Sequence, residues 1–180
     1  STLGKIDIHG PDAVEFLERM YTNNWRGLEV GRCRYGLMLG EDGMVMDDGV
    51  TARLGESHYQ MFTTTGGVAN VMTWLERWLQ TEWPELNVFL TSVTDQWATM
   101  SIVGPKSRQV ISQLSNDIDF SSDAFPFLSF RDGNVAGVPA RVFRISFSGE
   151  LTYEVNVPAD YGRPVWEAIM EAGNVHGITP

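Results

Sequence analysis

A small set of residues recurs along the chain at one constant separation, and this recurrence limits the possible architecture more than any other feature. The residues Gly10-Pro11, Gly55-Glu56 and Tyr59 reappear 94 positions later as Gly104-Pro105, Gly149-Glu150 and Tyr153. Each match falls at the same point of a strand-and-helix pattern, which favours a duplicated unit over chance. We therefore predict an α+β protein with two related halves, about 1–90 and 91–180, each an antiparallel sheet with helices packed on it.

Hydrophobic periodicity assigns the individual elements. Strands are predicted from alternating or continuous apolar runs, and helices from apolar positions three and four residues apart. The predicted strands are 5–9, 35–39, 44–54, 58–64, 97–103, 127–130, 140–147 and 153–157. The predicted helices are 11–22, 68–79, 105–114 and 160–172. The turn cluster Glu41-Asp42-Gly43 should join the second and third strands as a hairpin.

Charge and residue usage exclude several classes of protein. The 180 residues include 13 basic and 23 acidic side chains, a net charge of −10 that disfavours binding to nucleic acid or to anionic membrane surfaces. No apolar run is long enough to span a bilayer. The one cysteine, Cys33, and the scattered His9, His58 and His176 predict neither a disulfide nor a zinc tetrad. We expect a cytoplasmic protein without a metal site, excised from a longer chain.

Two adjacent acids, Asp47 and Asp48, interrupt the apolar run 44–50. Aspartate is a poor strand former and a buried carboxylate needs a partner, so the pair requires an explanation. Because side chains alternate along a strand, the two acids should point to opposite faces. One interpretation is a hairpin with solvated acids and a bulge at Gly49; the other is one acid placed in a cleft, where it steers a cationic or proton-donating ligand.

A glutamate in the predicted strand 153–157 is the second candidate. Glu154 lies between a tyrosine and a valine, so it could simply be on the polar side of an alternating strand. An ionised carboxylate accepts hydrogen bonds only, which also suits it to a ligand edge that offers two N–H donors, such as a guanidine-like or pterin edge. Both interpretations remain open at this point.

Four motifs together resemble a folate-binding family. They are 8–13 (Ile-His-Gly-Pro-Asp-Ala), 43–50 (Gly-Met-Val-Met-Asp-Asp-Gly-Val), 102–105 (Ile-Val-Gly-Pro) and 148–155, which contains Ser148-Gly149-Glu150 and Tyr153-Glu154-Val155. The family includes the T-protein of the glycine cleavage system, dimethylglycine dehydrogenase and the alpha subunit of heterotetrameric sarcosine oxidase. The segments 34–39 and 47–54 most resemble the last of these. The resemblance implies a partial folate-binding (aminomethyltransferase) domain over 1–180, with the rest of the domain and a C-terminal barrel absent.

The resemblance also implies roles for single residues. Asp48 matches the catalytic aspartate near the reactive nitrogens of tetrahydrofolate, and Glu154 matches the glutamate that binds the amino-pyrimidine edge of the pterin. Tyr35 matches an aromatic side chain of the folate pocket, and Thr64 stands where T-proteins often have asparagine. Phe147 replaces a tyrosine of the T-protein motif, so a hydroxyl contact from that position is absent.

The implied parent reaction oxidises sarcosine at a flavin and passes the one-carbon unit of the imine intermediate to tetrahydrofolate, giving 5,10-methylenetetrahydrofolate. FAD, FMN and NAD, together with the other sarcosine oxidase subunits, are expected outside these residues, because 1–180 has no dinucleotide-binding fingerprint. The fragment alone is expected to be inactive in amine oxidation. The alternatives are a T-protein-type aminomethyltransferase, a non-catalytic folate-binding accessory module, or a subunit-contact domain that has lost the ligand.

Overall fold

The chain folds into two compact units, each with its own antiparallel sheet. The computed structural model describes residues 3–180; residues 3–94 form the first unit and residues 95–180 the second. In the first unit the elements are β1 (Gly4–His9), α1 (Ala13–Met20), β2 (Cys33–Leu39), β3 (Val45–Gly55), β4 (His58–Thr63), α2 (Val68–Thr81) and β5 (Phe89–Ser92). In the second they are β6 (Trp97–Val103), α3 (Ser107–Ile111), β7 (Ser129–Val135), β8 (Val138–Arg144), β9 (Thr152–Pro158) and α4 (Gly162–Gly173).

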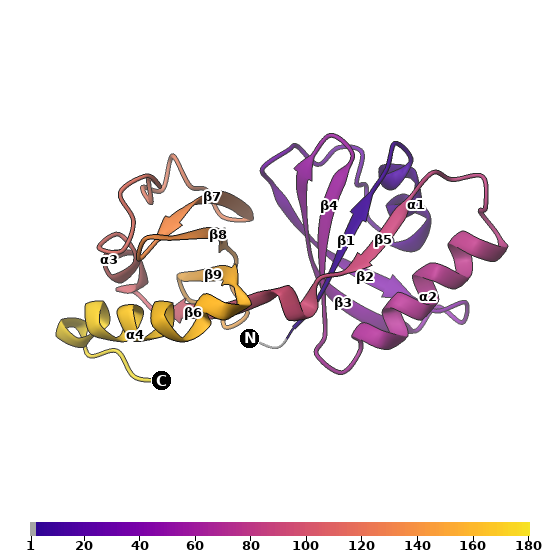
Figure 1. Cartoon of the computed structure of the whole chain (residues 1–180). Helices are drawn as coiled ribbons and strands as arrows, with labels where there is room; N and C mark the ends of the chain where they lie inside the picture. The colour runs from indigo at the N-terminus through magenta and orange to yellow at the C-terminus, as the bar shows by residue number, and fades with distance from the viewer. Residues whose placement is uncertain (1–2) are drawn as a thin grey trace. The chain divides into compact units, whose positions relative to one another are not determined.

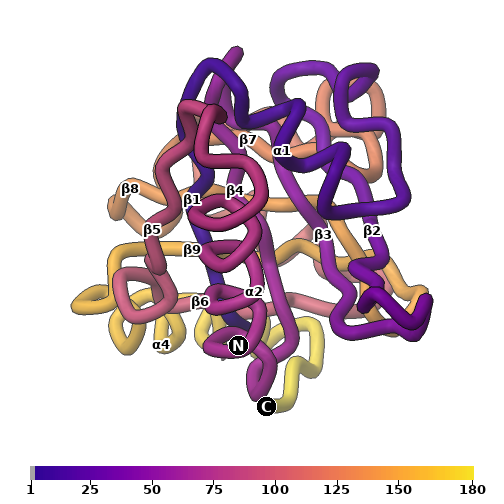
Figure 2. Tube along the Cα trace, turned by 90° about the vertical axis from the view of Figure 1, so that its right-hand side faces the viewer, coloured from indigo at the N-terminus to yellow at the C-terminus, as the bar shows by residue number. Residues whose placement is uncertain are grey.

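The first sheet has the strand order β2-β3-β4-β1-β5, and all its pairs are antiparallel. Helices α1 and α2 lie on one face of this sheet, as Figures 1 and 2 show. The core between the two layers comes from apolar side chains that alternate on the strands and form a stripe on each helix. Its fully buried members include Ile6, Ile8, Phe16, Leu17, Met38, Tyr59, Met61 and Leu75. The opposite face of the sheet is therefore the one without helices.

The second sheet has the order β6-β9-β8-β7, also antiparallel. Its core joins Tyr153, Val155 and Val157 of β9 to Val165 and Ile169 of α4. The intervening residues of β9 therefore point to the face away from this core. The α+β class with antiparallel sheets and packed helices is confirmed.

Both units pair their strands in a similar order. The order β2-β3-β4-β1 in the first sheet corresponds to β7-β8-β9-β6 in the second. In each, the strand that opens the unit lies beside the strand of its last hairpin, β4 or β9. This order agrees with the recurrence at 94 positions, but a duplication of the sequence stays a prediction. No helix within residues 3–180 is both long and apolar enough to cross a membrane.

Four elements differ most from the sequence-based prediction. The short strand β5 was not predicted, and β7 is Ser129–Val135 instead of 127–130. Helix α3 ends at Ile111, so Leu114 lies beyond it. Strand β8 ends at Arg144, which leaves Phe147 in the connection to β9. The β7–β8 connection explains part of the difference. Ala136 and Gly137 both have positive φ and form a tight hairpin turn, but alanine is not a residue from which such a turn is predicted in a sequence.

Candidate functional site

The two adjacent acids of β3 do point to opposite faces of the first sheet. Asp47 lies opposite Met38, a core residue, whereas Asp48 lies opposite Leu37, which is exposed. Asp47 is thus on the face covered by the helices and Asp48 on the open face. The register irregularity between β2 and β3 falls at Met38 and Leu39 and not at Gly49.

Asp47 has a structural role. Its side chain is buried, and its two carboxylate oxygens accept the backbone N–H of Thr64 at 3.3 and 3.2 Å. It also lies near the buried Tyr21 phenol; burial raises the pKa of Tyr21 above the usual range, and the negative charge of Asp47 raises it further. The interpretation with two solvated acids therefore does not hold for Asp47, because this buried carboxylate holds the turn between β4 and α2.

Asp48 is half-buried on the open face, where it contacts Tyr35. The Tyr35 hydroxyl donates a hydrogen bond of 2.7 Å to Asp48 Oδ2. This bond raises the pKa of the Tyr35 phenol, since the carboxylate stabilises the protonated hydroxyl and its charge opposes ionisation. Tyr35 is 50% exposed. The hairpin thus presents an oriented carboxylate beside an accessible aromatic ring.

The backbone of β3 comes close to β4 just after the acids. A Cβ atom on Gly49 would lie 2.1 Å from the carbonyl oxygen of Phe62, a contact that real side chains do not make. Glycine at this position therefore allows the two strands to approach each other next to Asp48. This close approach accounts for the glycine that follows the two acids in the sequence.

Glu154 lies on β9 of the second unit. It is 7% exposed and alternates with the core residues Tyr153 and Val155, so its side chain is on the face away from α4. In the ladder it lies opposite Ser101 of β6 and Phe143 of β8. A carboxylate at this position is enclosed by protein on a sheet face without helices, which is a suitable place for an acceptor that recognises N–H donors.

The predicted site residues fall into three groups. Tyr35 and Asp48 are in direct contact, whereas Thr64 is exposed and contacts the acid pair through Asp47. Glu154 and Phe147 belong to the second unit, and Phe147 is fully exposed in the connection between β8 and β9. The Tyr35–Asp48 contact was missed in the sequence, although pairing the strands across the turn 41–43 would have placed the two side chains on one face.

Comparison with known proteins gives consistent matches over the whole chain. The sarcosine oxidase subunit alpha of Corynebacterium sp. (strain U-96) is 57% identical over 181 residues, and the match covers 100% of this chain and 19% of that protein. The aminomethyltransferase of Chloroherpeton thalassium is 30% identical and is covered to 48% of its length. This chain thus spans about a fifth of the first relative and about half of the second.

A solved structure supports the same fold. The glycine cleavage system aminomethyltransferase T from Bartonella henselae superposes with a TM-score of 0.78 at 20% identity, covering 94% of this chain and 44% of that one. At this level of identity the likeness concerns the fold alone. The family model that describes the GCVT N-terminal domain matches residues 1–180. The chain therefore belongs to the GCVT N-terminal domain family.

Proposed function

We propose that these residues form the tetrahydrofolate-binding part of a sarcosine oxidase alpha subunit, which transfers the one-carbon unit of oxidised sarcosine to tetrahydrofolate and gives 5,10-methylenetetrahydrofolate. The observation that carries this proposal is the Asp48 carboxylate, half-buried on the open sheet face and oriented by the Tyr35 hydroxyl. The 57% identity to an alpha subunit, against 30% to an aminomethyltransferase, favours this parent enzyme over the glycine cleavage T-protein.

The chemistry of the residues fits the folate. A pterin presents adjacent N–H donors on its amino-pyrimidine edge, and the enclosed Glu154 carboxylate can only accept hydrogen bonds. A flat ring system also needs an apolar surface to pack on, which the half-exposed ring of Tyr35 offers. Glu154 would thus orient the pterin edge, while Tyr35 would contact the ring system. When bound, tetrahydrofolate supplies the amine nitrogens that accept the carbon.

In the overall reaction, the methylene carbon would leave the nitrogen of the sarcosine-derived imine and become bonded to two nitrogens of tetrahydrofolate. Each of these two nitrogens would release one proton, and the two protons would replace the carbon on the nitrogen of the product glycine. Positive charge would develop on the acceptor amine nitrogen as it bonds to the imine carbon, until that nitrogen loses its proton. An ionised Asp48 beside that carbon would stabilise the charge, and partial burial strengthens this effect because the local dielectric is lower than that of water. The hydrogen bond from Tyr35 engages Oδ2 and leaves Oδ1 as an acceptor. Tyr35 would therefore position the carboxylate.

The remaining parts of this reaction belong to the proposal as well. FAD, FMN and NAD would be bound by other parts of the enzyme, and other sarcosine oxidase subunits would complete the assembly. The chain would act in the cytoplasm on a small-molecule imine. Phe147 and Thr64 would line the folate site, Phe147 through its fully exposed ring and Thr64 from the end of β4.

The test separates binding from transfer in the complete protein, including any chain that flanks these residues. Calorimetric titration with tetrahydrofolate should show that Glu154→Gln weakens binding about 10- to 100-fold, since hydrogen bonds to a charged group contribute roughly 1.5–3 kcal/mol. Product formation from sarcosine should show that Asp48→Asn lowers the transfer rate far more than folate affinity. The exposed acids Glu150 and Glu41 provide the matched controls Glu150→Gln and Glu41→Gln, which should change neither property.

Equal loss of binding and transfer in both variants would contradict these separate roles. Full transfer activity in Asp48→Asn would remove Asp48 from the mechanism. Unchanged folate affinity in Glu154→Gln would place the pterin edge elsewhere. Efficient transfer from an aminomethyl-lipoyl donor in place of oxidised sarcosine would instead support the T-protein alternative.

A further inference from the structure

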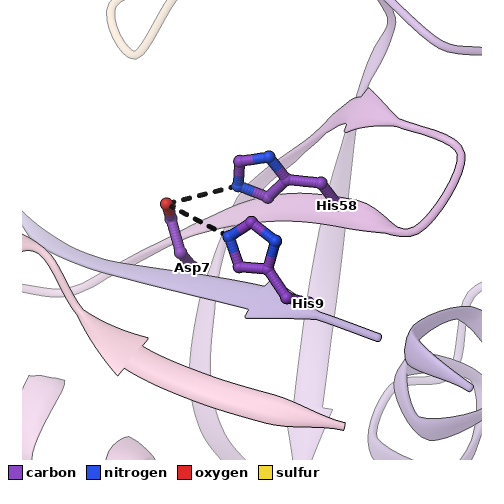
Figure 3. A group of neighbouring side chains, drawn as sticks. All are labelled: Asp7, His9 and His58. Atoms are coloured by element: carbon purple, nitrogen blue, oxygen red, sulfur yellow. Dashed lines mark hydrogen bonds and ion pairs between the residues drawn. The ribbon is translucent and has the colours of Figure 1, made fainter. Parts of the chain in front are cut away.

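The end of the β1–β4 ladder brings together three side chains that the proposed function does not use. Asp7 and His9 are two residues apart on β1, so they share a face of the sheet. His58, the first residue of β4, lies directly opposite His9. An Asp-x-His sequence on one strand therefore faces a His-x-Gln sequence on its neighbour, and Figure 3 shows both imidazole rings directed at the Asp7 carboxylate.

The distances in this Asp7–His9–His58 group resemble those between the ligands of one metal ion. Asp7 Oδ2 lies 3.2 Å from Nε2 of His58 and 3.8 Å from Nε2 of His9. One ligand atom from each residue can be chosen so that all three lie within 4.8 Å of one another. Bonds of about 2.0–2.1 Å in a tetrahedral zinc site place two ligand atoms roughly 3.3 Å apart, which is close to the Asp7–His58 distance. An ion would in addition require the two stacked imidazole rings to turn apart, so that both Nε2 lone pairs point to it.

A fourth residue fixes the orientation of the carboxylate. The Gln60 side-chain amide is buried and donates a 3.1 Å hydrogen bond to Asp7 Oδ1. This bond leaves Oδ2 on the side of the two histidines. Metal sites in proteins commonly orient their ligands by such outer hydrogen bonds, and removal of one typically lowers metal affinity 10- to 100-fold.

The two imidazole rings are stacked, with centroids 3.6 Å apart and planes 24° from parallel. The Nε2 atoms of both rings lie on the side of the Asp7 carboxylate. Neutral imidazole is the form that binds a metal. The side chains are 47% exposed for His9, 30% for His58 and 18% for Asp7, so an ion could enter and keep a water ligand.

We propose that Asp7, His9 and His58 bind one divalent transition-metal ion of the Zn²⁺ type, with water as the fourth ligand and Gln60 as the residue that orients Asp7. Two histidines and one carboxylate form a recognised zinc ligand set, with an open fourth position. The site is built entirely within the first unit and does not depend on folate binding. It departs from the expectation, based on the scattered histidines, that the protein has no metal site.

The test is a metal titration of the complete protein after it has been stripped with a chelator. Titration with Co²⁺ should produce the visible absorption of a four-coordinate ion, and competition with Zn²⁺ should abolish it. His9→Asn and His58→Asn should each lower Zn²⁺ affinity at this site by at least about tenfold, with Gln60→Ala at roughly 10- to 100-fold. His176→Asn is the matched control, because this third histidine lies in the second unit, and it should leave the affinity unchanged.

A thermal measurement guards against misfolded variants. Saturating Zn²⁺ should raise the Tm of the wild-type protein and of His176→Asn, because an ion that binds only the folded state stabilises it. The same addition should leave the Tm of His9→Asn nearly unchanged; this variant alters the most exposed of the three side chains and should still fold. The proposal is overturned if His9→Asn and His58→Asn bind the same number of ions with the same affinity as wild type.

Discussion

The β1–β4 ladder of the first sheet and the β6–β9 ladder of the second pair their strands in the same register, but they place different side chains at the matching positions. Asp7 lies opposite Gln60 in the first, and Ser101 lies opposite Glu154 in the second. Ser101 lies 94 positions after Asp7, and Glu154 lies 94 positions after Gln60, which is the interval at which the sequence motifs recur. The carboxylate therefore lies on the first strand of the pair, β1, in one ladder and on the second strand, β9, in the other.

The two acids also differ in the side chains that they contact. The Asp7 carboxylate interacts with an amide at one oxygen and with imidazole at the other, all within its own ladder. Glu154 has a serine and a phenylalanine as its cross-strand neighbours. Similar scaffolds can therefore support an internal polar cluster in one unit and, as proposed, a ligand-binding acid in the other. Function is determined by the side chains on the open face and not by the strand order.

The largest expected effect concerns the glycines that directly follow β1 and β6. Gly10 and Gly104 both have strongly positive φ, but only at Gly10 would a Cβ atom meet backbone, 2.1 Å from the carbonyl oxygen of Asn87. Gly104→Ala should cost about 1–3 kcal/mol of unfolding free energy from backbone strain. Gly10→Ala should cost roughly 3–5 kcal/mol, since overlap adds to the strain. Urea unfolding measures both, and equal losses would contradict the difference between the two turns.

A smaller loss of stability is expected when Gln60 of the first ladder is replaced by glutamate, the residue at the matching position 154 of the second ladder. Gln60→Glu replaces a buried donor with a carboxyl group beside Asp7 and should cost about 2–4 kcal/mol at neutral pH. The negative charge of Asp7 should raise the pKa of the new carboxyl in the folded state. The loss is therefore expected to be absent at pH values below the unfolded pKa of about 4.3 and to grow as the pH rises.

Urea unfolding at several pH values tests this second prediction. Gln109→Glu, at an exposed position of α3, is the control and should change the stability little at any pH. A loss of stability in Gln60→Glu that does not depend on pH would show that packing, and not the charge of Asp7, is responsible.

The smallest effect is a change in one titration. Because the hydrogen bond to Asp48 raises the pKa of Tyr35, Asp48→Asn should lower that pKa toward its ordinary value of 10.0. The phenolate form would then appear at lower pH, which an alkaline absorbance titration detects, with Tyr35→Phe identifying the contribution of this residue. An unchanged curve would mean that the contact does not persist in solution. Folding stability should change little, since the ring is half-exposed.

The sequence predicts those parts of the fold in which local patterns and packing agree. Strand β6 has the predicted bounds, and α2 and β4 differ by at most two residues at an end, because each carries a clear apolar pattern. Strand β5 was missed because its four residues are mostly exposed and depend on pairing with β1. The bounds of β7 were misjudged because Asp132, Gly133 and Asn134 are poor strand formers that pairing with β8 keeps extended.

The candidate site shows the same division between local and long-range information. Alternation alone predicts that Asp47 and Asp48 face opposite ways, and this is confirmed by their partners. Which of the two faces is open depends on where α1 and α2 pack, and that is a property of the tertiary structure. The Asp7–His9–His58 group was missed for a related reason: the spacing of His58 from His9 in the sequence has no meaning until β1 and β4 are paired.

The contact between Asp47 and the turn after β4 has a consequence for dynamics. Thr64 is exposed, and an amide hydrogen in such a turn would ordinarily exchange rapidly with deuterium from solvent. Here that hydrogen is held by a buried carboxylate on β3. Exchange at Thr64 therefore requires β3 to separate from the turn, and because Asp48 is the next residue along β3, slow exchange at this one amide would report how rigidly the strand holds the acid on the open face.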